Sequence, residues 1–167
     1  LWTAFPEAFG SVMSTLFIPL SLAALGIVLR GAGFAFHRVA ARSSAQRLAE
    51  AAFAISSVLT PFFMGTVVGA VASGRVPVGN AEGDPVTSWL NPLSLLVGTL
   101  FVAPSAYLAA GFLISDARRL GDDGLERYFR ARSLAVAVVA GAVAIAGIFV
   151  LRDDARYVYD RLVDQGL

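Results

Sequence analysis

Residues 11–36 form an apolar stretch of 26 residues that carries one charge, Arg30, near its C-terminal end. As an α-helix this stretch would be about 39 Å long, because each residue adds roughly 1.5 Å. The hydrocarbon core of a bilayer is about 30 Å thick, and about 20 apolar residues cross it. The sequence therefore predicts a membrane-spanning helix here.

The composition extends this prediction to the whole chain. Of the 167 residues, 57% are hydrophobic and 15% are charged, and the mean hydropathy is +0.71. Soluble domains contain about 25% charged residues, so this chain carries more apolar surface than a water-soluble core can bury. The net charge of +1 gives no general attraction to nucleic acid, and we expect no nucleic-acid partner.

Three further apolar runs follow the first, each bounded by polar, arginine-bearing connections. We predict an all-α, polytopic transmembrane helix bundle in a single domain of residues 1–167. Its four complete spans are residues 11–36, 51–73, 91–115 and 134–151. We expect residues 1–5 to be the helical end of an earlier span, joined by a tight connection at Pro6 and Gly10.

Prolines and small residues predict details of these spans. Pro19, Pro61 and Pro104 lie within spans, where a proline removes a backbone hydrogen bond and bends the helix. Gly65 and Gly69 form a small-xxx-small pair, which lets two membrane helices approach closely.

The third span has a distinct start signal. Asn91 followed by Pro92 is typical of a helix that begins with an asparagine cap and a proline in its first turn.

Arginine counts predict the orientation of the bundle. The successive connections carry three, one and five arginines, and the C-terminal tail carries three. Because cytoplasmic loops of membrane proteins are enriched in Lys and Arg, we expect residues 37–50 and 116–133 to lie in the cytoplasm. Residues 74–90 and the tail would then lie outside, and the tail is expected to form a short surface helix.

The side chains available for chemistry are few. The chain has no cysteine, one histidine (His37) and two methionines (Met13 and Met64). A haem held by two protein ligands would need a well-placed pair from these three side chains. We therefore expect no haem, no metal and no catalytic residue in this chain, and no nucleotide-binding or hydrolase motif is present.

Some polar and aromatic residues are candidates for contacts with a partner. Arg30 is either a cation that reaches the headgroups or an inward-facing partner of a carboxylate or acidic cofactor group on another subunit. Glu7 is either an interfacial carboxylate or part of a proton path. The remaining candidates are two packing phenylalanines, a tryptophan at a span boundary and the cap of the third span: Phe34, Phe36, Trp89 and Asn91.

Two segments carry a resemblance to a known family. The run PLSLAALGIVLRGAGFAF, preceded by LWTAFPEAFG, resembles subunit II of cytochrome bd-type quinol oxidases, which has a similar Phe-Pro turn and an Arg-x-x-x-Phe-x-Phe ending. Asn91-Pro92 followed by LSLLVG is similar to the family's Asn-Pro-Phe opening, with Leu93 in place of the phenylalanine. His37 stands where the family more often has a basic residue.

The resemblance implies a supporting role in quinol oxidation coupled to the reduction of oxygen to water. It implies a partner subunit I that holds haem b and haem d, while subunit II stabilises it and can hold a structural quinone. It also implies a bacterial cell membrane location, and that the chain lacks the family's N-terminal portion and part of the second half. Because the family's proton-access residues lie mainly in that missing portion, no site residue is carried over.

Two other functions fit the residues alone. Proline-interrupted spans also suit a small transporter or permease fragment. A structural subunit of another membrane complex is the third alternative. Co-purification distinguishes these functions from that of an oxidase subunit, because only an oxidase subunit should carry haem absorbance from an attached larger subunit.

Overall fold

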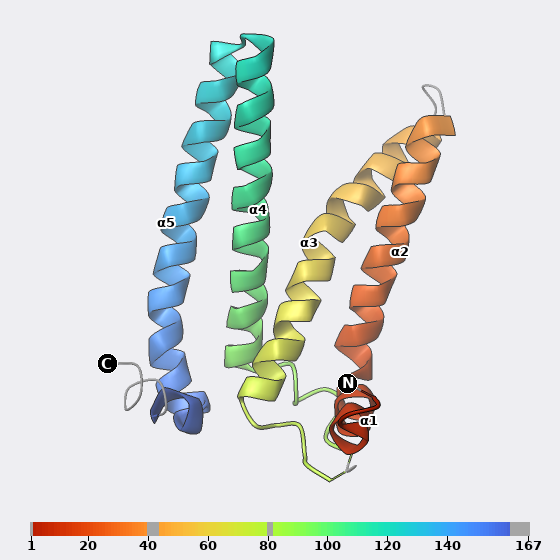
Figure 1. Ribbon diagram of the computed structural model, residues 1–167, viewed down its shortest axis with the longest axis vertical. Coiled ribbons are helices and arrows are strands. Elements are labelled where there is room, and N and C mark those ends of the chain that lie inside the picture. Colours follow the sequence, from red (N-terminus) through yellow and green to blue (C-terminus); the bar gives the residue numbers. More distant parts are fainter. Residues whose placement is uncertain (1, 40–43, 80–81, 161–167) are drawn as a thin grey trace.

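Five helices account for most of the chain in the computed structural model, which describes residues 2–39, 44–79 and 82–160 (Figure 1). They are α1 (Pro6–Thr15), α2 (Phe17–Val39), α3 (Ser44–Ala72), α4 (Pro92–Leu120) and α5 (Asp123–Asp154). Residues 156–160 are also helical, and the described residues contain no strand. Four of the helices, α2 to α5, are long and apolar enough to cross a membrane. The predicted all-α bundle with four spans is confirmed.

The four long helices form two hairpins. In the first α2 packs against α3, in the second α4 packs against α5, and α3 packs against α4 to join them (Figure 1). The hairpins lie close together near the 74–91 connection and diverge toward their other ends (Figure 1). Helix α5 is consequently at the edge of the molecule.

The first span differs from the prediction, because the helix is interrupted at Leu16. Helix α1 ends at Thr15 and α2 begins at Phe17. The Leu16 N–H donates to the Val12 carbonyl, and the Leu20 N–H donates to the Leu16 carbonyl. Pro19 has no N–H to donate to the Thr15 carbonyl, so the helical ladder is broken there. Pro19 ends one helix instead of bending a longer one, whereas Pro61 and Pro104 lie inside continuous helices.

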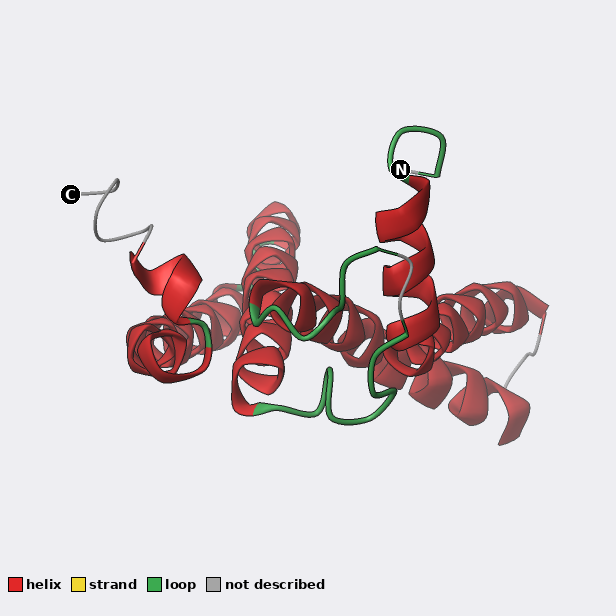
Figure 2. Ribbon diagram, turned by 90° about the horizontal axis from the view of Figure 1, so that it is seen from below, coloured by secondary structure: helices red, strands yellow, loops and turns green. Residues whose placement is uncertain are grey.

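The start of the chain also differs from the prediction. Residues 2–4 form a turn, and Pro6 and Gly10, expected to form a tight connection, lie inside α1. A proline is well tolerated in the first turn of a helix, where its missing N–H has no partner to lose. Figure 2 shows α1 projecting sideways from the end of α2 instead of running along the bundle.

The connections at the opposite end are shorter than predicted. Residues 116–133, expected to be a loop, are almost entirely helical, since α4 continues to Leu120 and α5 begins at Asp123. Gly121 has the left-handed φ of 69° that suits a glycine helix end, and the Asp122 side chain caps α5 by accepting from the Leu125 N–H. Residues 37–50 are also mostly helical, because α2 continues to Val39 and α3 starts at Ser44.

The crossing of α3 and α4 is built from small residues. A Cβ atom added to Gly69 would lie 2.5 Å from the Ser94 Cα, and one added to Gly65 would lie 2.7 Å from the Gly98 Cα. The small-xxx-small pair of α3 therefore meets a second pair, Ser94 and Gly98, on α4. Such close contact holds membrane helices together, because lipid provides no hydrophobic drive for their association.

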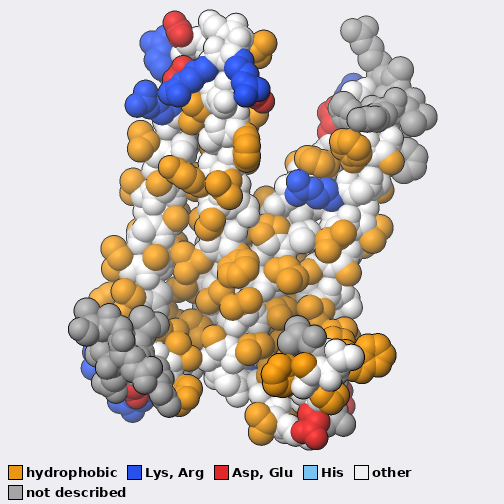
Figure 3. Space-filling model, viewed as in Figure 1, with side chains coloured by type: hydrophobic (Ala, Val, Ile, Leu, Met, Phe, Trp, Pro, Cys, Tyr) orange, Lys and Arg blue, Asp and Glu red, His pale blue; other side chains and the backbone are white. Residues whose placement is uncertain are grey.

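Charged and apolar side chains occupy different positions along the length of the hairpins. Apolar side chains cover the middle of the hairpins, and arginines and carboxylates gather at the turn between α4 and α5 (Figure 3). That turn and the α2–α3 connection lie at the same end of the bundle, while the 74–91 connection lies at the other (Figure 1). The C-terminal end of α2 and the start of α3 are therefore on the same side of the bundle as the α4–α5 turn.

Candidate functional site

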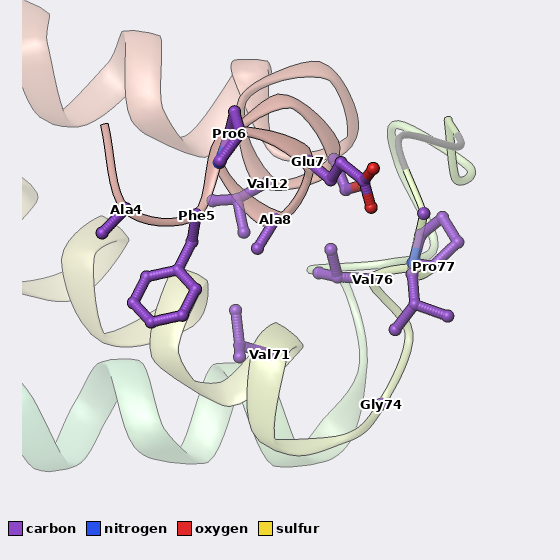
Figure 4. A pocket seen from close by; sticks show the side chains of 13 residues that line it. Ala4, Phe5, Pro6, Glu7, Ala8, Val12, Val71, Gly74, Val76 and Pro77 are labelled. Carbon is purple, nitrogen blue, oxygen red and sulfur yellow. The ribbon is translucent and has the colours of Figure 1, made fainter. Parts of the chain in front are cut away.

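A pocket of about 760 Å³ lies between α1 and the end of α3. We call it the α1 pocket. It is lined from α1 and the preceding turn by Ala4, Phe5, Pro6, Glu7, Ala8, Ser11 and Val12, and from the other side by Val71, Gly74, Val76, Pro77, Val78 and Gly79. In Figure 4, Phe5, Ala8 and Val12 face Val71 across the opening, and the Glu7 carboxylate lies at the edge nearest Val76 and Pro77. Its walls are mostly apolar, with a charge at one edge.

Helix α1 is held over this pocket by a contact with the 74–91 connection. The Gly83 N–H donates to the Thr15 hydroxyl over 3.0 Å, and Thr15 is fully buried. A Cβ on Gly83 would lie 2.8 Å from the Thr15 methyl group, so the contact requires glycine. Gly74 and Gly79 have φ angles of 70° and 80°, which allow the connection to turn beneath α1.

Two polar side chains of α1 reach the pocket one helical turn apart. Glu7 is exposed, whereas Ser11 is 1% exposed. The Ser11 Oγ atom is buried and has no hydrogen-bond partner among the described residues. A buried hydroxyl without a partner costs roughly 1–3 kcal/mol. Glu7 is therefore the accessible polar side chain of the pocket on α1, while the Ser11 hydroxyl lies buried.

Arg30 lies on the surface of the α2–α3 hairpin. Its Cζ atom is 5.1 Å from the centre of the Phe53 ring, a cation–π contact. The ion pairs within the described part of the chain join other residues, Arg75 with Asp154 and Arg118 with Glu126. The exposed guanidinium thus rests on an aromatic ring of the neighbouring helix.

Phe34 lies one turn beyond Arg30, on the same hairpin. It lines a shallow apolar pocket of about 370 Å³ with Gly33, Ala49, Glu50 and Phe53, and its side chain is 59% exposed. Gly33 packs closely, since its added Cβ would lie 2.9 Å from the Ala49 carbonyl oxygen, whereas an added Cβ on Gly31 would have nothing within 4 Å. The Phe36 side chain lies outside what the structure describes.

Trp89 and Asn91 have contacts within the chain. The Trp89 indole N–H donates to the Pro85 carbonyl over 3.0 Å, and its ring meets Phe63 edge-on. Asn91 is 4% exposed, accepts from the Ser94 N–H and donates to the Ser88 carbonyl. The predicted start of the third span is confirmed, and both side chains fix the connection that ends there. Among the candidate residues whose side chains are described, Glu7 lines the α1 pocket. Arg30, Trp89 and Asn91 lie elsewhere.

Two features were missed by the sequence analysis. Ser11 is one of many serines in apolar runs, so nothing in the sequence marks it. Arg75 donates to the Asp154 carboxylate over 2.5 Å and joins the 74–91 connection to the end of α5. These residues are 79 positions apart, so only the fold could show that they meet.

The chain's possible haem ligands are two methionines and one histidine. Met13 and Met64 lie on α1 and α3 and are 45% and 42% exposed, and the His37 side chain lies outside the described part. Within the described ranges, no group of three or more His, Cys, Asp or Glu side chains could hold a metal ion.

Apolar helices in hairpins, charges at the helix ends and small-residue crossings define a polytopic α-helical membrane protein. A model of the family described as cytochrome bd terminal oxidase subunit II matches residues 1–158. The chain belongs to this family and is a multi-pass membrane subunit of a quinol oxidase. Comparison with curated proteins and with solved structures gave no match.

Proposed function

We propose that this chain is a non-haem part of the oxidase that packs against and stabilises a haem-bearing subunit during quinol oxidation coupled to oxygen reduction. Family membership supports a place in the oxidase, and the shortage of haem ligands supports the assignment of the haems to another subunit. A bacterial cell membrane is the proposed location, and the arginine-rich ends support an orientation with the α2–α3 and α4–α5 turns in the cytoplasm. A structural quinone and haems b and d in the partner belong to the same proposal.

The observation that carries the proposal is the unburied surface of the second hairpin. All 32 residues of α5 are described, and Ser133 and Gly147 are the buried ones. Gly111 on α4 and Gly141 on α5 have nothing within 4 Å of an added Cβ. Exposed glycines on apolar helices are typical of surfaces that contact other helices. This outer face of α4 and α5 is therefore our candidate for the partner contact.

Arg30 is our candidate for a polar contact with that partner. A charge within a span costs several kcal/mol unless it is paired or reaches the interface. Its aromatic support from Phe53 holds the guanidinium at the surface, where a partner carboxylate could reach it.

Replacing Arg30 by Ala tests this contact. We expect less assembled oxidase and a lower haem content in membranes. Arg47→Ala is the control, because Arg47 is an exposed arginine near the start of α3, on the same hairpin as Arg30 but at its charged end. Unchanged haem spectra and oxygen consumption in Arg30→Ala would leave Arg30 as a residue that only reaches the headgroups.

A further inference from the structure

The α1 pocket has the features of a site for an amphiphile. Its volume of about 760 Å³ lies within the roughly 300–1,000 Å³ of small-molecule sites. Phe5, Ala8, Val12 and Val71 supply apolar walls, and Figure 4 shows them facing the same space. Glu7 adds one carboxylate at the edge of these walls, so the pocket combines an apolar interior with a charged edge.

The position of α1 places this pocket at the edge of the membrane. The helix lies crosswise to the long helices, at the end of the bundle where α2 begins (Figures 1 and 2). Trp2 stacks on Phe9 with ring centres 6.1 Å apart, and Phe5 is 62% exposed. Exposed aromatic side chains are typical of the boundary between hydrocarbon and headgroups. A ligand here would have its polar end at headgroup depth and its apolar end in the bilayer.

The charge of the α1 pocket determines which kind of headgroup a ligand there can have. Glu7 is acidic, and none of the described residues that line the pocket is Lys or Arg. A ligand with only an anionic headgroup would meet a carboxylate and find no cation. An ammonium group would donate to Glu7 in a charge-assisted hydrogen bond, the stronger kind.

We propose that the α1 pocket binds a zwitterionic aminophospholipid, such as phosphatidylethanolamine. Glu7 accepts from the ammonium, at the edge of the pocket nearest Val76 and Pro77. The acyl chains lie against Phe5, Val12 and Val71.

The test is native mass spectrometry of the full chain, extracted from vesicles of equal phosphatidylethanolamine and phosphatidylcholine with matched acyl chains. The two lipids differ in whether the headgroup nitrogen carries hydrogens to donate. We expect the chain to retain roughly five times more phosphatidylethanolamine than phosphatidylcholine. A buried charge-assisted hydrogen bond would give a larger ratio, but Glu7 is exposed and its charge is screened by water. Glu7→Gln should bring the ratio close to one, since it removes the charge and keeps the shape.

Glu82→Gln is the matched control, because Glu82 is an exposed carboxylate on the same side of the bundle that does not line the pocket. It should keep the preference. Ala8→Phe should reduce retention of both lipids by filling the pocket, with helix content by circular dichroism confirming that it folds. An unchanged ratio in Glu7→Gln, equal retention of the two lipids by the original chain, or retention of a quinone instead of a phospholipid would each overturn the proposal.

Discussion

Gly69 is the residue at the closest approach of the two hairpins, and its lack of a side chain has a measurable consequence. A Cβ there would lie 2.5 Å from the Ser94 Cα, so any larger residue forces α3 away from α4. We expect Gly69→Val to destabilise the folded chain by about 1–3 kcal/mol, the usual cost of overpacking, in mixed-micelle unfolding. Gly111→Val is the control, because nothing lies within 4 Å of Gly111. Equal stability of the two variants would contradict the crossing described above.

Asp84 gives the 74–91 connection a pH dependence at the scale of one residue. The Thr87 and Val86 N–H groups donate to its carboxylate over 2.7 and 2.8 Å, and they hold its pKa below its ordinary value. Because the folded pKa is lowered, this contribution to stability is complete above the ordinary pKa and is lost as pH falls through the folded one. A carboxyl NMR titration of Asp84 should show an inflection below that of Asp in an unfolded peptide. An inflection at or above that value would contradict these hydrogen bonds.

Helix α5 is attached to the rest of the molecule by few contacts outside α4. The ion pair of Arg75 with Asp154 is one of them, and the two side chains are 35% and 18% exposed. A double-mutant cycle of Arg75→Ala and Asp154→Asn should give a coupling of about 1 kcal/mol, near the upper end for partly exposed pairs. The Arg118–Glu126 pair is the control, since it joins adjacent ends of one hairpin. Additive effects at Arg75 and Asp154 would show that the pair does not hold α5.

The elements show which features the sequence could reveal. Apolar runs identified four spans, and Asn91-Pro92 identified the start of α4, because both signals are local. The sequence analysis placed one bent helix around Pro19, where the structure has two helices, since the outcome depends on where α1 packs. The charged residues 116–133 were expected to be a loop, but a helix can extend beyond the membrane when Gly121 and Asp122 make the turn. Ser11 and the Arg75–Asp154 pair depend on tertiary contacts and left no local signal.

At the scale of the whole molecule, both arginine-rich turns lie at one end, so the chain should have one orientation in the membrane. The chain has no cysteine, so single cysteines can report its topology. Leu120 and Val78 are 79% and 91% exposed at opposite ends, and Arg47 is exposed near the start of α3. In intact cells an impermeant maleimide should label Val78→Cys only, and permeabilised cells should show labelling of Leu120→Cys and Arg47→Cys as well. Labelling of Leu120→Cys and Arg47→Cys from opposite sides would contradict the two-hairpin arrangement.

The proposed role of this chain is to support a haem-bearing subunit while holding no haem itself. Its most direct test is the reduced-minus-oxidised absorption spectrum of the affinity-tagged chain, purified from its native membranes and, separately, after expression alone. We expect haem bands together with a larger co-purified subunit in the first preparation, and no Soret band in the second. A Soret band from the chain alone, or a native preparation without a haem-bearing partner, would contradict the account.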